Sequence, residues 1–187
     1  KIMELKEQRP GILGVIADIV KVEKQYETAI ETALGGTIQN IVTDNENTAK
    51  DLIAYLKQNR FGRATFLPLS AIQVRNTLEG EPCMKEKGVI GAASDLVRVS
   101  FEYEKLAKYL LGRILVVDNI DNALAIARKY RHSLRIVTLE GEQLNPGGSM
   151  TGGAFKNSSN LLGRRREMED LETKVQLARS HVTQLQK

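Results

Sequence analysis

The sequence contains only one cysteine, four prolines and no tryptophan among 187 residues. Cys83 has no partner for an internal disulfide, which excludes a disulfide-stapled secreted scaffold and favours a reducing compartment. No apolar run approaches the roughly 20 residues that span a bilayer, and no signal peptide is recognisable. Aromatic residues make up only 5%, which predicts a mainly aliphatic core. The chain opens at Lys1 rather than at a methionine, so we expect it to be a segment of a longer protein.

Groups that carry out catalysis are equally scarce. The two histidines, His132 and His181, do not form with Cys83 a spacing typical of a metal site or of a nucleophile and its base. Asp18 and Asp95 form a duplicated carboxylate pair, for which a structural role such as accepting hydrogen bonds from turn amides is favoured. We therefore expect no catalytic residue, no metal site and no cofactor within this chain. The net charge of +4 is too small to identify a partner.

The C-terminal stretch has the pattern of a coiled coil. Apolar residues recur there at alternating steps of three and four, with polar residues between them, and such a seam needs a partner helix. The seam consists of Met168, Leu171, Val175, Ala178, Val182 and Leu185. A shorter helical pattern at the N-terminus ends at Arg9-Pro10-Gly11, because proline and glycine end helices. We expect an incoming and an outgoing helical stub that pair antiparallel; an ordinary amphipathic helix packed on its own domain is the alternative.

The body between these stubs is an internal duplication. A segment that begins at Gly11 matches one that begins at Gly88, and after a short slip the match resumes with Asp44-Asn45 against Asp118-Asn119. At the first offset the identical pairs are Gly11/Gly88, Gly14/Gly91, Asp18/Asp95, Val20/Val97, Val22/Val99, Tyr26/Tyr103, Glu27/Glu104, Leu34/Leu111 and Gly35/Gly112. Such self-similarity predicts two pseudo-equivalent lobes.

Each copy predicts the same succession of elements, which makes the fold class α/β (α+β). An apolar run that suits a strand (15–22 and 92–99) precedes a helix ended by glycine, a short β run, a helix capped by Asp-Asn and a closing strand. The expected organisation is an incoming helix end over 1–10, lobe 1 over 11–69, a linker over 70–87, lobe 2 over 88–155, and the junction with the outgoing coil over 156–187. The linker is polar and rich in turn residues, so we expect it to be mobile.

Four glycines within seven residues mark the segment 145–155. A phosphate-binding loop needs Gly-Lys-Ser/Thr, and no lysine occurs there before Lys156. A nucleophile elbow needs a second glycine where Thr151 stands, and the spacing also fails as a dinucleotide-binding fingerprint. A glycine-rich strand at a sheet edge is instead a docking site for a strand of another chain. A flexible linker is the alternative.

The string Gly147-Gly148-Ser149-Met150-Thr151-Gly152-Gly153, following a duplicated α/β body and flanked by coiled-coil patterns, resembles the hinge domain of bacterial SMC (structural maintenance of chromosomes) proteins. Residues 26–30 and 61–69 fit that family as well, so the resemblance covers essentially the whole chain. It implies a two-lobed hinge that homodimerises and so joins two long antiparallel coiled-coil rods. It further implies that ATP, Mg and kleisin-type subunits bind head domains that lie outside this chain.

The resemblance also implies where the dimer forms and what it serves. In that family, glycines on the C-terminal side of the hinge lie at the dimer interface, and we add the side chains that flank them. The expected interface residues are Gly147, Gly148, Met150, Thr151, Gly152, Gly153 and Phe155. The implied function is chromosome condensation and segregation by a condensin-like ATPase at the nucleoid, in the cytoplasm and without a membrane partner. A duplicated α/β module that binds a small molecule or nucleotide is the alternative.

DNA is the second partner that the resemblance implies, at the junction of hinge and coil. That junction carries Lys156 and three consecutive arginines, Arg164, Arg165 and Arg166, which form a compact basic stretch. Phosphate contacts need only such charge, and they give sequence-independent, salt-dependent binding. The alternative is a solvated helix start in which Arg165 and Arg166 pair with acidic residues one turn further on.

Overall fold

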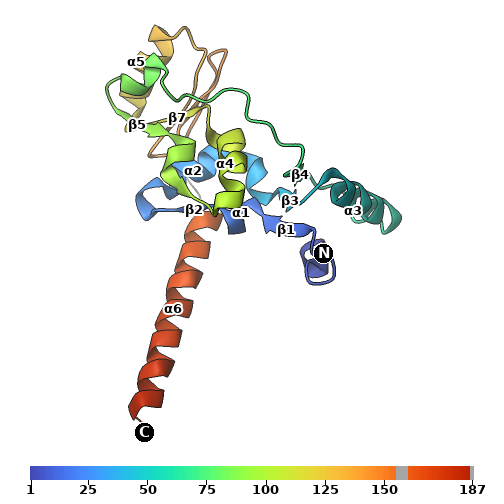
Figure 1. The fold of residues 1–187 in the computed structure, drawn as a ribbon. Helices are drawn as coiled ribbons and strands as arrows, with labels where there is room; N and C mark the ends of the chain where they lie inside the picture. Colours follow the sequence, from blue (N-terminus) through green and yellow to red (C-terminus); the bar gives the residue numbers. More distant parts are fainter. Residues whose placement is uncertain (155–159, 186–187) are drawn as a thin grey trace.

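The computed structural model describes residues 1–154 and 160–185. It consists of two lobes side by side, from which one long helix, α6 (Leu161–Leu185), projects (Figure 1). Lobe 1 contains a three-stranded sheet of β1 (Ile12–Val15), β3 (Ile41–Thr43) and β4 (Phe66–Pro68) in the order β1-β3-β4. The first pair of strands is antiparallel and the second is parallel. Among the described residues, no helix has both the length and the apolar character needed to cross a membrane.

Lobe 2 contains the same three strands and extends them by two more. Its sheet has the order β10-β9-β8-β7-β5. The strands are β5 (Val89–Ala92), β7 (Ile114–Val117), β8 (Arg135–Thr138), β9 (Gln143–Leu144) and β10 (Met150–Thr151). β5 is antiparallel to β7, β7 is parallel to β8, and β9 and β10 continue the sheet antiparallel. The core of lobe 2 therefore repeats lobe 1, and the β9–β10 hairpin is the addition.

Strand registers confirm the duplication at the level of single residues. Gly14 pairs with Val42, and its equivalent Gly91 pairs with Val116. In both lobes the strand register shifts just before this glycine, between Ile12 and Gly14 in lobe 1 and between Val89 and Gly91 in lobe 2. In the same way, Ile41 pairs with Phe66 where Leu115 pairs with Ile136. Both copies thus preserve the same irregularity, which two unrelated sheets would not share.

The helices of the two lobes correspond as well. α2 (Glu27–Leu34) and α4 (Glu104–Leu111) are equivalent, as are α3 (Glu46–Gln58) and α5 (Ile120–Lys129). Short 3-10 helices fill the connections: η1 (Met3–Leu5), η2 (Lys24–Tyr26), η3 (Gly35–Gln39), η4 (Pro82–Lys85), η5 (Ala93–Leu96) and η6 (Phe101–Tyr103).

The strands predicted over 15–22 and 92–99 are wrong for most of their length. In lobe 1 the chain forms the helical turn α1 (Ile16–Ile19) and then the short strand β2 (Lys21–Val22); in lobe 2 it forms η5 and then β6 (Val97–Arg98). Ile16 and Val20 are both buried, a spacing of four that suits a helical turn. The mistake arises because a short apolar run has no periodicity that separates a strand from one buried turn.

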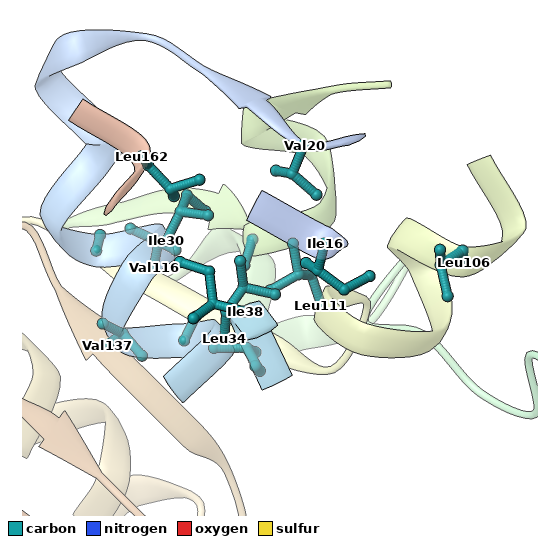
Figure 2. Packing of buried hydrophobic residues seen from close by; sticks show 14 of the residues in the cluster. Ile16, Val20, Ile30, Leu34, Ile38, Leu106, Leu111, Val116, Val137 and Leu162 are labelled. Carbon is teal, nitrogen blue, oxygen red and sulfur yellow. The ribbon is translucent and has the colours of Figure 1, made fainter. Parts of the chain in front are cut away.

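One hydrophobic cluster lies between the lobes and belongs to both (Figure 2). Ile30 and Leu34 of α2 meet Leu106 and Leu111 of α4 there, and the inner faces of both sheets contribute. Leu162, at the start of α6, also inserts into this cluster. Because removing apolar surface from water is favourable, this shared cluster holds the lobes against each other.

β2 and β6 form a second link between the lobes, and it has an internal symmetry. The two strands pair antiparallel, with Lys21 opposite Arg98 and Val22 opposite Val97. Lys21 and Arg98 are equivalent positions of the duplication, so a pseudo-twofold axis passes through this pair. The lobes are therefore related as the two halves of a symmetric dimer would be.

Each lobe has a tight corner where a glycine meets a capped helix. The side chain of Asn45 accepts a hydrogen bond from the Thr48 N–H, and that of Asn119 accepts one from the Asn122 N–H, so both residues are N-caps. Asp44 N–H donates to the carbonyl of Gly11 at 3.0 Å, and lobe 2 repeats the bond. A Cβ added at Gly11 would lie 2.7 Å from the Thr48 hydroxyl, which explains the glycine.

The linker between the lobes, expected to be mobile, is anchored at several points. Ile72 is buried in the common cluster, and Leu78 and Cys83 are buried in the core of lobe 2. The Leu78 N–H donates to the carbonyl of Gly112 at 2.9 Å. Turn-rich composition did not predict these anchors, because single apolar residues among polar ones carry no periodic signal.

The N-terminal residues do not pair with the outgoing helix. Residues 1–10 contain only η1, and Ile2 packs into a cluster with Ile12, Leu52 and Leu56 of lobe 1. In Figure 1 the N-terminus lies beside lobe 1, well away from α6. The expected antiparallel pair of stubs is therefore absent from the described residues. A segment this short gains more from packing on a preformed sheet than from forming an isolated helix.

The two N-caps give a matched test of the duplicated corner. We expect Asn45→Ala and Asn119→Ala each to lower the free energy of unfolding by about 1 kcal/mol, because a helix N–H loses its acceptor. Urea denaturation at one fixed protein concentration measures the change. Asn47→Ala, at an exposed position in the same turn of α3, serves as the control and should change stability by less than about 0.5 kcal/mol. Equal effects at all three positions would contradict the assignment of the caps.

Candidate functional site

The glycine-rich segment forms the outer hairpin of lobe 2. Gly147 and Gly148 have φ values of 90° and 101° and make the turn between β9 and β10. The Gly147 N–H donates to the His132 carbonyl at 2.8 Å, and the Asn145 N–H donates to the Ser149 carbonyl at 2.9 Å. Side chains other than glycine rarely adopt positive φ, so this turn explains both glycines locally.

β10 is the edge strand of the five-stranded sheet, and one side of it is open within the described residues. Met150 is 54% exposed, although it lies opposite Leu144, which is buried. Opposed residues of an antiparallel pair share a face, so Met150 points to the same side of the sheet as Leu144, the side covered by α5. Thr151, Gly152 and Gly153 continue this edge, while Phe155 and Lys156 lie outside the described residues.

Lobe 1 has a matching open edge at β4. In lobe 2 the equivalent strand, β8, is covered by β9, whereas β4 ends its sheet. A groove of about 500 Å³ runs between β4 and α3 at this place. Ile53 of α3, which is 43% exposed, lies along it. The groove is lined by Glu46, Ala49, Lys50, Ile53, Ala64, Thr65, Phe66 and Pro68.

The three arginines at the start of α6 have separate surroundings. Arg165 forms an ion pair with Asp18 of α1, and Arg166 forms one with Glu27 of α2. Arg166 also lies 3.2 Å from Asp170, one turn further along α6. Arg164 is exposed. Asp18, for which hydrogen bonds to turn amides were expected, instead binds a cation from the far end of the chain.

Further contacts hold the first turn of α6 on lobe 1. The Leu161 N–H donates to the Glu31 carboxylate at 3.0 Å. Within the start of the helix itself, the Asn160 side chain accepts a hydrogen bond from the Gly163 N–H at 2.9 Å. Burial raises the pKa of Glu31 above its ordinary value, against the lowering effect of the Leu161 hydrogen bond. Lys21 of β2 pairs with Glu169, which extends the contact by a further turn.

Beyond this first part, α6 has no cover from the rest of the described chain. Leu162 is buried, but the heptad positions that follow are exposed. They include Met168, Leu171, Val175, Val182 and Leu185. The apolar seam predicted from the sequence is therefore open to a partner helix.

The carboxylates that hold α6 were not identified from the sequence as partners of the arginines. Glu27 is only 5% exposed, which is unusual for a glutamate without a cation beside it. A signal was available, because Glu27 lies among the apolar positions of an amphipathic helix. A carboxylate in that position indicates a buried partner.

Comparison with known proteins identifies the family. The model of the SMC proteins Flexible Hinge Domain matches residues 9–127. The chain belongs to the SMC hinge family. The hinge is 45% identical over 178 residues to the Chromosome partition protein Smc of Bacillus subtilis (strain 168), a match that spans 94% of this chain and 15% of the relative. The chain thus corresponds to a small part of the curated relatives it matches.

Solved structures agree with the fold of this hinge. The crystal structure of an asymmetric dimer of the Geobacillus stearothermophilus SMC hinge domain matches with a TM-score of 0.85 at 39% identity, covering 99% of this chain and 75% of that one. The Pyrococcus furiosus SMC hinge domain matches with a TM-score of 0.67 at 32% identity, over 83% of this chain and 84% of that one. The expected recognition and the α/β (α+β) fold class are therefore confirmed.

The pairing of Glu27 with Arg166 can be tested by removing the cation. We expect Arg166→Met to lower the free energy of unfolding by about 2 kcal/mol, because the nearly buried Glu27 carboxylate would lose its charged hydrogen-bond donor. Arg164→Met is the matched control, since Arg164 is exposed, and should change stability by less than about 0.5 kcal/mol. Denaturant titrations of both variants measure the difference. Similar values for the two would show that Arg166 does not hold α6 on lobe 1.

Proposed function

We propose that the hinge forms a homodimer in which β10 of each protomer pairs with β4 of the other. The observation that supports this most directly is the pair of unequal sheet edges: the place beside β8 is filled by β9, while no strand of residues 1–154 or 160–185 fills the equivalent place beside β4. Open strand edges with unpaired backbone groups are docking sites for further strands. In such a pairing, the three strands of one protomer would continue the five of the other.

The side chains of the two edges suit this pairing. Leu144 of β9 packs against α5 in lobe 2, on the same face of the sheet as Met150. Placed beside β4, Met150 would enter the groove under α3 and contact Ile53 and Phe66. Both Met150 and Ile53 are exposed large apolar residues in the single chain, and the contact would bury both. The glycines on either side of β10, Gly148 and Gly152, carry no side chain, so that a backbone can approach this edge.

A twofold axis makes the arrangement close on itself. Each protomer offers one β10 edge and one β4 edge, so two protomers form two identical contacts and leave neither edge open. Four similar lobes would then lie in a ring, two from each protomer. The glycine-rich residues expected at the interface, Gly147 to Gly153, belong to this contact, and Phe155 follows it in sequence.

We further propose that this dimer joins the arms of a chromosome partition SMC protein without carrying out catalysis itself. The exposed seam of α6 supports the connection to an arm, because it needs a second helix. ATP hydrolysis, Mg and kleisin-type subunits belong in this proposal to parts of the protein beyond the hinge. Its place of action would be the nucleoid.

Charge complementation tests the dimer. We expect Met150→Glu and Ile53→Lys each to give a monomer near 20.8 kDa at micromolar concentration, since a charge would be buried in an apolar contact. Mixing the two variants should restore a dimer, because one interface would then pair Glu with Lys and the other would be wild type. Analytical ultracentrifugation measures all three masses.

The matched control for this experiment is Ile90→Lys. Ile90 is also an exposed isoleucine, but it lies on β5, at the opposite edge of the lobe 2 sheet. This variant should stay dimeric. The proposal fails if both single variants stay dimeric as well, or if their mixture stays monomeric while circular dichroism shows both to be folded.

DNA binding at the start of the coil is the other part of the proposed function. Arg165 and Arg166 already neutralise Asp18 and Glu27, so phosphate contacts by these two would have to displace carboxylates. Arg164 is exposed, and it lies beside them in sequence. We therefore assign the phosphate contact of the described junction to Arg164, while Lys156, which lies outside the described residues, stays a candidate on its charge alone.

Salt dependence tests this assignment. We expect Arg164→Gln to lower the affinity for a labelled 20-base-pair duplex and to reduce the slope of log K against log salt by about 0.9, the value for one lost phosphate contact. Fluorescence anisotropy from low to moderate salt measures both quantities. Arg179→Gln removes the same charge from an exposed position farther along α6 and should leave the slope unchanged. An unchanged slope for Arg164→Gln would exclude Arg164 from the contact.

A further inference from the structure

A groove between the linker and lobe 2 has a volume of about 650 Å³, within the range of small-ligand sites. One wall is the linker over 71–76. The other wall is formed by the end of α4 and the first residues of β7 and β8, with Pro146 beside them. In Figure 1 the linker passes on the far side of α4 from α6, so the groove is separate from the junction with the coil.

The backbone around this groove is pinned. Ile72 and Leu78 anchor the linker in two different hydrophobic clusters, and the Leu78 N–H donates to the Gly112 carbonyl at 2.9 Å. A Cβ at Gly112 would lie 3.0 Å from the Thr77 methyl carbon, so the glycine lets the linker lie close to the end of α4. A groove with fixed walls is present before any ligand binds, which lowers the entropy lost on binding.

Four cationic side chains line this groove: Arg75, Lys108, Arg113 and Arg135. No carboxylate is among the lining residues, and within the described part of the chain none of the four takes part in an ion pair. Like charges gathered in one concavity repel one another and raise the local positive potential. A bound anion would relieve this repulsion, so the groove is suited to a negatively charged ligand.

Arg135 carries a donor that the described residues do not use. One of its terminal nitrogens donates to the Ala33 carbonyl at 3.1 Å, which holds the guanidinium in place. Its Nε is buried and has no hydrogen-bond partner in the described part of the chain. A buried donor without an acceptor is costly, and a phosphate oxygen is an acceptor that arginine binds well. The chemistry of this side chain therefore indicates a phosphate group.

The grouping of the four cations favours a compact polyanion over a polymer. A nucleic-acid strand carries its phosphates one to a nucleotide, and proteins hold it in a groove whose cations follow the backbone. Here the four cations line a single cavity instead. A chain of two or three linked phosphates places its negative charges on neighbouring groups, so it would face several of these cations at once.

Tyr109 adds an aromatic surface beside these charges. It lines the groove from α4 and is 48% exposed. Apolar side chains of Val74 and Leu110 lie in the same lining. A flat heterocycle stacks on an exposed tyrosine ring, and such a contact accepts any base because each base has a π-face. The groove thus has a place for a base as well as for phosphates.

We propose that this groove binds a free nucleoside di- or triphosphate, with its phosphates on Arg75, Arg113 and Arg135. The base stacks on Tyr109. No carboxylate among the described lining residues is placed to hold Mg²⁺, so the metal-free nucleotide is the expected ligand. The site shares no residue with Arg164, β4 or β10, and it can therefore be tested without affecting the other proposed contacts.

Calorimetry with ATP in metal-free buffer tests the cations. Arg75→Gln with Arg113→Gln removes two exposed cations from the groove, and Arg128→Gln with Arg179→Gln removes two exposed cations elsewhere. We expect the groove variant to bind ATP about 100-fold more weakly, which is about ten-fold for each charged hydrogen bond lost. The control variant should bind as the wild type does. Added Mg²⁺ should weaken wild-type binding, because it neutralises the phosphates.

The contact with the base is tested separately. We expect Tyr109→Ala to weaken ATP binding about ten-fold and to leave the binding of inorganic triphosphate unchanged, since triphosphate has no base to stack. Phe101→Ala is the matched control, because Phe101 is also an exposed aromatic residue but lies outside the groove. It should change neither affinity.

Three results would overturn the proposal. The first is no heat of binding from wild type at about 1 mM ATP. The second is equal ATP affinity for the groove variant and its charge-matched control, with both folded by circular dichroism and equal in sedimentation mass. The third is displacement of ATP by a single-stranded oligothymidine at a lower phosphate concentration than ADP requires, because the groove would then belong to a surface for nucleic acid.

Discussion

The hydrophobic cluster between the lobes is the contact on which the rest of the hinge depends, because it uses the inner face of both sheets. Val42 and Val116, at equivalent places in the two sheets, are both buried in it. The outer faces are covered by α3 and α5, whose buried residues form two further clusters. With both faces occupied, each sheet can meet a partner only through its edges. In the proposed dimer, this cluster therefore favours association by strand pairing over stacking of sheets.

In the proposed dimer, the duplication makes the two edges complementary. Lobe 2 carries the β9–β10 hairpin beside β8, and lobe 1 retains the shape that receives a strand without containing one. An addition to one copy alone thus leaves an open acceptor on the other. Had both lobes the hairpin, two outer strands would face each other and the groove beside α3 would be filled. The unequal lobes explain how one chain can offer both halves of a contact.

Local features of the fold could be predicted from the sequence, and distant pairings could not. The corners at Asp44-Asn45 and Asp118-Asn119 were predicted because a cap depends on residues three positions apart. The helical turn at Ile16 was missed because four residues carry too little pattern. The partners of Arg165 and Arg166 lie 147 and 139 residues earlier in the chain. No spacing rule reaches that far, so the arginines were interpreted by their neighbours in sequence.

Those distant pairings connect α6 to the core of the hinge. Leu162 enters the common cluster, and Arg165 and Arg166 bind α1 and α2, which pack in the same cluster through Ile16 and Ile30. α6 therefore leaves the hinge as an extension of the rigid core and not of a flexible tether. Two protomers joined through their sheet edges would fix the direction of both coils, because each step from edge to sheet, cluster and helix is a packed contact.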